Sequence, residues 1–313
     1  MSRTGWWQPV AELDAAVPID REWLQANPLP QPGDEADKNA RGRVMTIGGG
    51  VEVPGGIRLT AEAALRAGAG KVRVATVAPA TVGLGAHLPE VALMALPFGE
   101  DGEIDAAQVK FTNRLAAFDA IVIGPAMCGV QQASLLLSRV LEAIEPDTGL
   151  VIDAAALMDL AQHREALRAL PRPALLTPHI GEMAALLGVS AETIEQDRAG
   201  AVQRAAKEYH AVVMLKGATS VIAGAGGSLF RYDGGLVGLA TGGSGDVLAG
   251  IAGALMARGA EPLQAMAWAV WIHGEAGQAC GRAIAPLGFL ASELLSYIPR
   301  AMHFETVEPQ QED

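Results

Sequence analysis

The stretch RVMTIGGGVEVPGGIRLTAEAALRAGAGKVRVATV, residues 43–77, decides the fold class. It places an apolar run rich in β-branched residues before a glycine turn, then an Ala- and Leu-rich segment of helical period, then a second β-branched run. Further apolar runs, each with turn residues and a helical pattern behind it, occur at 119–125, 150–154, 173–178 and 211–217. This alternation predicts an α/β fold with a mostly parallel central sheet and helices on both faces.

The pattern changes after residue 217. Short apolar runs at 220–224, 228–233 and 236–240 are separated by turn residues, which predicts a short antiparallel edge of the same sheet. Helical segments are then expected to begin near residues 245, 262 and 286.

The chain divides into three parts. Residues 1–42 form an N-terminal extension, whose segment 27–42 is rich in Pro, Gly and charge and disfavours regular structure. Trp6, Trp7 and Trp23 indicate that this extension docks onto the body or onto a neighbouring molecule. Residues 43–302 form one α/β domain, and residues 303–313 form a polar C-terminal tail.

Composition excludes some partners. The formal net charge of −12 and the lack of a Lys/Arg run argue against nucleic-acid binding. No apolar stretch reaches membrane-spanning length, so no membrane partner is expected. The two cysteines, Cys128 and Cys280, are too few for a disulfide framework or a metal motif, so a cytoplasmic location is expected.

The segment TGGSGDVLAG, residues 241–250, is typical of an anion site at a helix start. Glycines before a helix expose backbone N–H groups, which bind a phosphate together with the helix dipole. Asp246 in the first turn has two interpretations: it complements the dipole, or it accepts a proton from a hydroxyl that attacks a phosphoryl group.

Polar residues also follow three of the predicted strands. His179 comes after Pro178 and is either a structural histidine or a ligand contact in the crevice. Asp153 could hold a magnesium ion through water or cap the next helix. Glu182 could support the helix dipole or a magnesium-bound water. Lys216 ends a strand before a hairpin.

Four motifs in order resemble the nucleotide-dependent NAD(P)H-hydrate dehydratases of the ribokinase-like superfamily, the family of the YjeF carboxyl-terminal domain. They are the stretch from residue 42 to residue 76, LLTPHIGEMAALLG (175–188), VVMLKGATSVIAG (212–224) and TGGSGDVLAGIAGALMARG (241–259). With GFLASELLSYIP (288–299), the resemblance runs from Gly42 to Pro299. It implies that ADP, favoured over ATP, phosphorylates the hydroxyl of hydrated NADH or NADPH, and that phosphate then leaves by elimination.

The resemblance also implies site residues. Asp246 is the catalytic base, and the anion hole for the transferring phosphoryl group consists of Gly243, Ser244 and Gly245. Substrate-binding residues are Gly56, Gly129, His179 and Asp246. Nucleotide-binding residues are Lys216, Gly217, Ala218, Thr219, Ser220 and Gly245. Mg²⁺ is the implied metal, with Asp153 and Glu182 as candidate ligands, and a homo-oligomer, often a tetramer, is the implied assembly.

Two departures from the family pattern keep other functions open. Cys128 stands where the family has the last glycine of its Gly-Pro-Gly-Leu-Gly motif, and Ala155 replaces the second acid of an Asp-Ala-Asp-Ala-Leu motif. The alternatives are a ribokinase-like kinase of a sugar, vitamin or other small alcohol, and a nucleotide-binding protein without catalytic activity.

Overall fold

The computed structural model describes residues 13–31, 33, 37–111 and 114–304. Within these residues ten strands form one sheet, in the order β1-β10-β9-β8-β7-β6-β5-β2-β3-β4. The strands are β1 Val17–Pro18, β2 Arg43–Ile47, β3 Lys71–Val77, β4 Ala92–Leu96, β5 Ala120–Ile123, β6 Gly149–Ile152, β7 Leu175–Leu176, β8 Val212–Leu215, β9 Ser220–Ala223 and β10 Leu229–Tyr232.

The sheet is parallel from β4 to β8, and β9 runs antiparallel to both β8 and β10. The predicted parallel sheet with a short antiparallel edge is therefore confirmed. From β2 the chain adds β3 and β4 on one side and then β5 on the other, so strand order reverses between β2 and β5. In open α/β sheets the ligand crevice lies beyond the carboxyl ends of the strands, at such a reversal.

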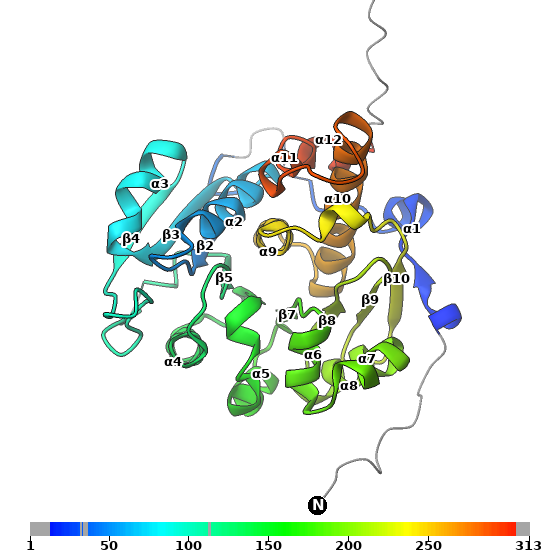
Figure 1. Cartoon of the computed structure of the whole chain (residues 1–313), viewed down its shortest axis with the longest axis horizontal. Helices are drawn as coiled ribbons and strands as arrows, with labels where there is room; N and C mark the ends of the chain where they lie inside the picture. The colour runs from blue at the N-terminus through cyan, green and yellow to red at the C-terminus, as the bar shows by residue number, and fades with distance from the viewer. Residues whose placement is uncertain (1–12, 32, 34–36, 112–113, 305–313) are drawn as a thin grey trace, which may run out of the picture.

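Helices cover both faces of the sheet (Figure 1). One face carries α2 Pro54–Arg66, α3 Thr81–His87, α9 Ser244–Ala257, α10 Pro262–Ala283, α11 Ala291–Leu294 and α12 Ile298–Met302, together with α1 Arg21–Ala26 at the β1 end. The other face carries α4 Val130–Leu141, α5 Arg164–Arg168, α6 Ile180–Leu187, α7 Ala191–Gln196 and α8 Arg198–Tyr209.

Helix α9 packs unusually close to its neighbours because of two of its glycines. A Cβ on Gly250 would lie 2.2 Å from the carbonyl oxygen of Thr60 in α2, and one on Gly253 would lie 2.3 Å from Val122 of β5. Neither position has room for a side chain, so the small residues of the α9 sequence fix this helix against α2 and the middle of the sheet. This packing determines where the first turn of α9 lies.

The prediction of a strand at 236–240 is wrong, because Val237–Leu239 form a 3₁₀ helix. Gly238 lies against Phe289 and the carbonyl of Pro286, with no room for a Cβ, and β1 already pairs with the free side of β10. The pattern also missed β4, whose segment ALMAL contains no alternation, and the two-residue strand β1.

The described part of the N-terminal extension docks onto the body, which is one of the two outcomes that its tryptophans indicated. Trp23 of α1 contacts Phe230 of β10 edge to face at 5.6 Å, and the Trp268 indole donates a hydrogen bond to the Asn27 carbonyl. Trp6 and Trp7 lie outside the described residues. Among the described helices, none combines the length and apolar character that a membrane span requires.

Candidate active site

Helix α9 begins with a left-handed glycine. Gly243 has a φ of 89°, and a Cβ there would lie 2.5 Å from Leu59, so both conformation and space require glycine. Among the described residues, no side chain caps this helix start. The first-turn N–H groups of Gly245 and Asp246 have no partner within the helix, and together with the dipole they can bind an anion.

The Asp246 carboxylate is enclosed by α2 and the loop after β5. A Cβ on Gly56 would lie 2.9 Å from Asp246 Oδ2 and 2.5 Å from the Ala126 methyl group. The backbone N–H of Ala126, whose φ is 56°, donates a hydrogen bond to Asp246. Gly56 therefore belongs to the site because its lack of a side chain makes room for Asp246. Ala126 adopts a sparsely populated backbone conformation in which its N–H contacts Asp246.

Burial raises the pKa of Asp246 from 3.8 to about 6, and the nearby charge of Asp153 adds to this effect. Lys216 and the Ala126 N–H lower the pKa but do not offset the burial. The group is therefore a stronger base than an exposed aspartate and is still ionised at neutral pH, as a general base requires.

Lys216 connects the acidic groups of the site. Its Nζ lies 2.8 Å from Asp153 Oδ1, and that carboxylate oxygen also accepts a hydrogen bond from Thr177 Oγ1 at 2.7 Å. Burial acts to lower the pKa of Lys216, but Asp153, Glu182 and Asp246 outweigh it and raise the pKa. The side chain is therefore a fixed cation next to Gly245, where a Cβ would lie 3.3 Å from Nζ.

His179 and Glu182 cap helix α6 reciprocally. His179 Nδ1 accepts hydrogen bonds from the backbone N–H groups of Gly181 and Glu182, and Glu182 Oε2 accepts one from the His179 N–H at 2.7 Å. Because Nδ1 accepts, the proton of the neutral ring is on Nε2. His179 Nε2 lies 3.5 Å from Glu182 Oε1, and because the His179 side chain is 61% exposed, a ligand can approach this N–H while Nδ1 caps the helix start.

Burial raises the pKa of Glu182, and Asp153 contributes in the same direction, while Lys216, the His179 N–H and the His179 ring lower it. The Glu182 carboxylate contacts the start of α6 through Oε2, which is compatible with both interpretations of this residue, the helix-dipole role and the role as a holder of magnesium-bound water.

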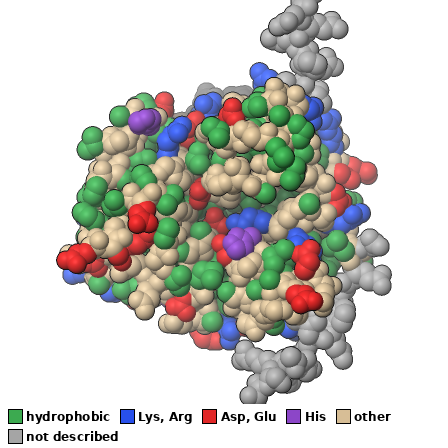
Figure 2. All heavy atoms as spheres, in the orientation of Figure 1, with side chains coloured by type: hydrophobic (Ala, Val, Ile, Leu, Met, Phe, Trp, Pro, Cys, Tyr) green, Lys and Arg blue, Asp and Glu red, His purple; other side chains and the backbone are tan. Residues whose placement is uncertain are grey.

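A cavity of about 660 Å³ joins these groups at the carboxyl end of the sheet. In Figure 2 a hollow near the middle of this face contains acidic, basic and histidine side chains side by side. Predicted residues that line the cavity are Asp153, His179, Lys216, Gly217, Ala218, Ser220, Gly243, Ser244, Gly245 and Asp246. A nucleotide fits a cavity of this size.

Four predicted residues do not line this cavity. Gly56 and Glu182 lie directly behind lining residues. The Thr219 side chain turns away and donates to Asp233. Gly129 precedes α4, where a Cβ would lie 3.1 Å from the Glu103 side chain.

Sequence reasoning missed two residues that shape the site. The guanidinium of Arg198 donates to the carbonyls of Lys216 and Thr219, and it fills the space where a Cβ of Gly217 would lie. The buried Glu103 carboxylate accepts the Cys128 N–H and lies against Gly50 and Gly129. Neither residue has a motif around it, so only the folded chain reveals these contacts.

His273 of α10 orients Ser244. Its Nε2 lies 3.0 Å from the Ser244 carbonyl and 2.9 Å from Ser244 Oγ. The carbonyl can only accept, so Nε2 carries the proton, and Oγ accepts from the same N–H. The Ser244 hydroxyl proton is then free to donate to an anion in the cavity. Burial lowers the pKa of His273 to about 4, so the ring stays neutral at neutral pH.

We therefore expect His273→Leu to lower kcat by about tenfold or more, because the hydroxyl is no longer oriented toward the transferring group. The KM for ADP should change far less, and His273→Gln, which can restore an N–H donor, should recover part of the loss. Steady-state kinetics across pH 5.5–8.5 test this. An equal loss in both variants would contradict an orienting role, and the wild-type profile should contain no inflection from His273.

The candidate metal ligands do not form a protein cage. No group of three His, Cys, Asp or Glu side chains suited to a metal occurs among the described residues. Asp153 Oδ1 is already bonded to Lys216 and Thr177, and Glu182 Oε2 to the His179 N–H. These residues fit a Mg²⁺ ion held chiefly by substrate phosphates and water, with at most one free oxygen from each carboxylate.

The mostly parallel sheet with a short antiparallel edge and helices on both faces is a ribokinase-like α/β fold. The fold alone is shared with ribokinase from Thermotoga maritima, at a TM-score of 0.51 and 11% identity over 82% of this chain and 99% of that one. The family model described as NAD(P)H-hydrate dehydratase matches residues 44–300, and the chain belongs to this family.

Individual relatives agree with the family. The chain is 42% identical to the ADP-dependent (S)-NAD(P)H-hydrate dehydratase of Xanthomonas campestris, over 88% of this chain and 92% of that protein. It spans about half the length of bifunctional NAD(P)H-hydrate repair enzymes such as that of Moorella thermoacetica, at 36% identity over 88% of this chain and 52% of that one. The ADP/ATP-dependent dehydratase of Bacillus subtilis, co-crystallised with ATP/Mg²⁺, superposes with a TM-score of 0.80 at 27% identity, covering 93% and 99% of the two chains.

Proposed function

We propose that this chain dehydrates hydrated NADH or NADPH and so restores the reduced dinucleotide, with ADP in preference to ATP as the phosphoryl donor. The observation that carries the proposal is the position of Asp246, a buried carboxylate with a pKa of about 6 in the first turn of α9. Family membership supplies the substrate class. The X. campestris relative, which its name describes as ADP-dependent, supports the choice of nucleotide.

The two substrates meet at Asp246. The nucleotide lies along the wall formed by Gly217, Ala218 and Ser220, with its terminal phosphate at the start of α9. The hydrated dinucleotide lies on the side of His179 and Gly56. Asp246 contacts Gly56 on one side and follows the anion-binding turn on the other, so it can reach a hydroxyl positioned between the substrates.

In the first step Asp246 accepts the hydroxyl proton while the substrate oxygen attacks the terminal phosphorus, and the bond from phosphorus to AMP breaks. The Gly245 N–H, the Ser244 hydroxyl and the Lys216 ammonium stabilise the charge on the phosphoryl oxygens. In the second step the ring nitrogen lone pair expels phosphate, a far better leaving group than hydroxide. Loss of a neighbouring ring proton completes the double bond.

Magnesium is part of this proposal. When bound, Mg²⁺ neutralises charge on the nucleotide phosphates. Asp153 and Glu182 would hold its water ligands, and Lys216 donates a hydrogen bond to Asp153 and attracts Glu182 by its charge. A cytoplasmic location and a homo-oligomer, with a tetramer as the expected form, remain predictions of the sequence.

The decisive experiment incubates the protein with hydrated NADPH and Mg²⁺, with ADP or ATP. We expect reduced-nicotinamide absorbance to return, with one phosphate and one AMP released per NADPH formed from ADP, and faster recovery with ADP than with ATP. A stable phosphorylated product from another small alcohol would instead identify a kinase. Nucleotide binding without turnover would identify a non-catalytic binding protein, and either result would overturn the proposal.

A further inference from the structure

A second cavity, of about 410 Å³, lies at the opposite end of the sheet from Asp246. Its wall includes the amino-terminal residues of β2 and β3 and the first residue of β4, whereas the candidate active site lies beyond the carboxyl ends of β6 and β8. The two cavities share no lining residue. We refer to this second cavity as the basic pocket.

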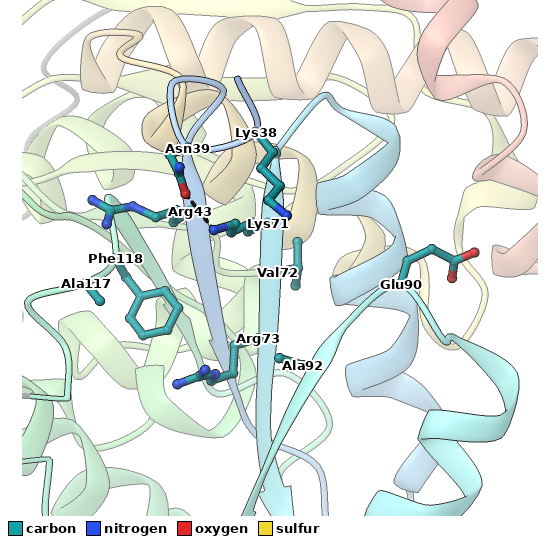
Figure 3. A pocket seen from close by; sticks show the side chains of 11 residues that line it. Lys38, Asn39, Arg43, Lys71, Val72, Arg73, Glu90, Ala92, Ala117 and Phe118 are labelled. Carbon is teal, nitrogen blue, oxygen red and sulfur yellow. Dashed lines mark hydrogen bonds between the residues drawn. The ribbon is translucent and has the colours of Figure 1, made fainter. Parts of the chain in front are cut away.

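Strand register brings cations onto one face of the sheet here. Arg43 and Lys71 are register partners in neighbouring parallel strands, and Arg73 follows two residues after Lys71. Because side chains alternate between faces, the three project from the same face, and the Cα atoms of Lys71 and Arg73 are about 7 Å apart. Lys38 reaches the same cavity from the loop before β2 (Figure 3).

Two of these cations are held in place by uncharged partners. Lys71 Nζ donates to the amide oxygen of Asn39 at 2.6 Å, and the Arg73 guanidinium lies over the Phe118 ring, 5.6 Å from its centroid. No carboxylate of the described residues lies within ion-pair distance of Lys38, Lys71 or Arg73. Both side chains are therefore oriented but not neutralised, which differs from Arg43, whose guanidinium is paired with Asp119.

The two acidic residues near these cations, Glu90 and Asp37, do not place a carboxylate among the basic groups of the cavity. Glu90 lines it but points away from the basic groups in Figure 3. The Asp37 carboxylate is close enough to respond to the charge of Lys71, but both of its oxygens accept hydrogen bonds from Asn39 or Ala40 of its own loop. A concave site with oriented, unneutralised cations is exceptional in a chain of net charge −12.

We propose that the basic pocket binds a small phosphorylated metabolite, with its phosphate between Lys71, Arg73 and Lys38. A planar guanidinium such as that of Arg73 suits two phosphate oxygens, and Lys71 and Lys38 add point charges. The cavity is large enough for an organic group of about nucleotide size, which would contact Ala92 and the surface around Phe118.

The test uses pyrophosphate as the probe and lysine acetylation as a readout at individual residues. The full chain is treated briefly with an acetylating reagent at several pyrophosphate concentrations, and peptide mass spectrometry measures the acetylation rate of each lysine. We expect pyrophosphate to slow acetylation of Lys71 at least fivefold. Acetylation of Lys207, exposed on α8, should not change. The readout involves no residue of the candidate active site, so failure of the proposed function does not affect the outcome.

Arg73→Gln should remove protection of Lys71 and leave the acetylation rate of Lys207 unchanged. Arg282→Gln, at an exposed position in the last turn of α10, is the matched control and should behave as wild type. In Lys71→Gln, protection of Lys38 should also be lost, which keeps the test valid if Arg73→Gln is unstable. Equal protection of Lys71 and Lys207, or protection of Lys71 that survives Arg73→Gln in a folded protein, would overturn the proposal.

Discussion

Asp246→Asn should lower the turnover number by about 10³-fold and leave ADP affinity within a few-fold of wild type. The amide keeps the shape of the side chain beside Gly56 but cannot accept the hydroxyl proton. NADPH recovery measures turnover, and calorimetric titration with ADP measures binding. Normal turnover in this variant would exclude Asp246 as the base.

The pH dependence of the wild type follows from the same residue. Turnover should fall as the pH drops through about 6, because Asp246 becomes protonated. The folded state binds the Asp246 proton more tightly than the unfolded chain does. The resulting contribution to the free energy of unfolding is fully present below pH 3.8 and is lost as the pH rises through about 6. Above this pH the ionised Asp246 carboxylate lowers the free energy of unfolding by about 3 kcal/mol.

Asp246→Asn should therefore be more stable than wild type, by an amount that grows between pH 4 and pH 7. Denaturant unfolding at both pH values measures the difference. Asp153→Asn provides a comparison, since it removes the partner of Lys216 and should destabilise the fold. A stability gain for Asp246→Asn that does not change with pH would contradict the raised pKa.

Lys216→Met should have the second large effect, on both stability and catalysis. It leaves the Asp153 carboxylate, whose side chain is 3% exposed, without its cation, which costs about 3 kcal/mol of unfolding free energy. Lys216 also lowers the pKa of Asp246, so the acidic limb of the kcat profile should move to a pH above 6. Turnover should fall about 100-fold, since a cation beside the transferring phosphate is lost.

Thermal unfolding and the pH profile of the residual activity check this prediction. Lys207→Met, on the exposed side of α8, removes a lysine without touching the site and should match wild type in both measurements. A Lys216→Met protein with normal stability and an unmoved profile would show that Lys216 does not connect Asp153 and Asp246.

The sequence predicted the strands and helices whose hydrophobic pattern matches their burial in the folded protein. The strands β2, β3, β5, β6, β7 and β8 are short buried apolar runs, and their burial in a parallel sheet is what such runs predict. The prediction of a strand at 236–240 was wrong because β1, which is more than 200 residues away in the sequence, already pairs with the edge of β10. A local sequence pattern does not show which of two distant segments will pair with a given strand edge.

The site was predictable where a motif follows a strand or begins a helix. Gly243, Asp246, His179 and Lys216 all lie at such positions, and the fold brings them to one cavity. The contact of His273 with Ser244 joins two helices across 29 residues, and its geometry depends on how α10 packs against α9. Such contacts depend on how two helices pack against each other, and the pattern of residues along the sequence does not predict them.

Strand β1 has a consequence for where this protein can be divided. The family model matches the chain from residue 44, but Val17 and Pro18 pair with Phe230 and Arg231 at the edge of the sheet. A chain shortened to the matched region would expose the backbone N–H and C=O groups of β10 and offer them to a strand of another molecule. The segment before residue 44 thus covers the edge of β10, and the sheet of this protein extends beyond the region that the family model matches.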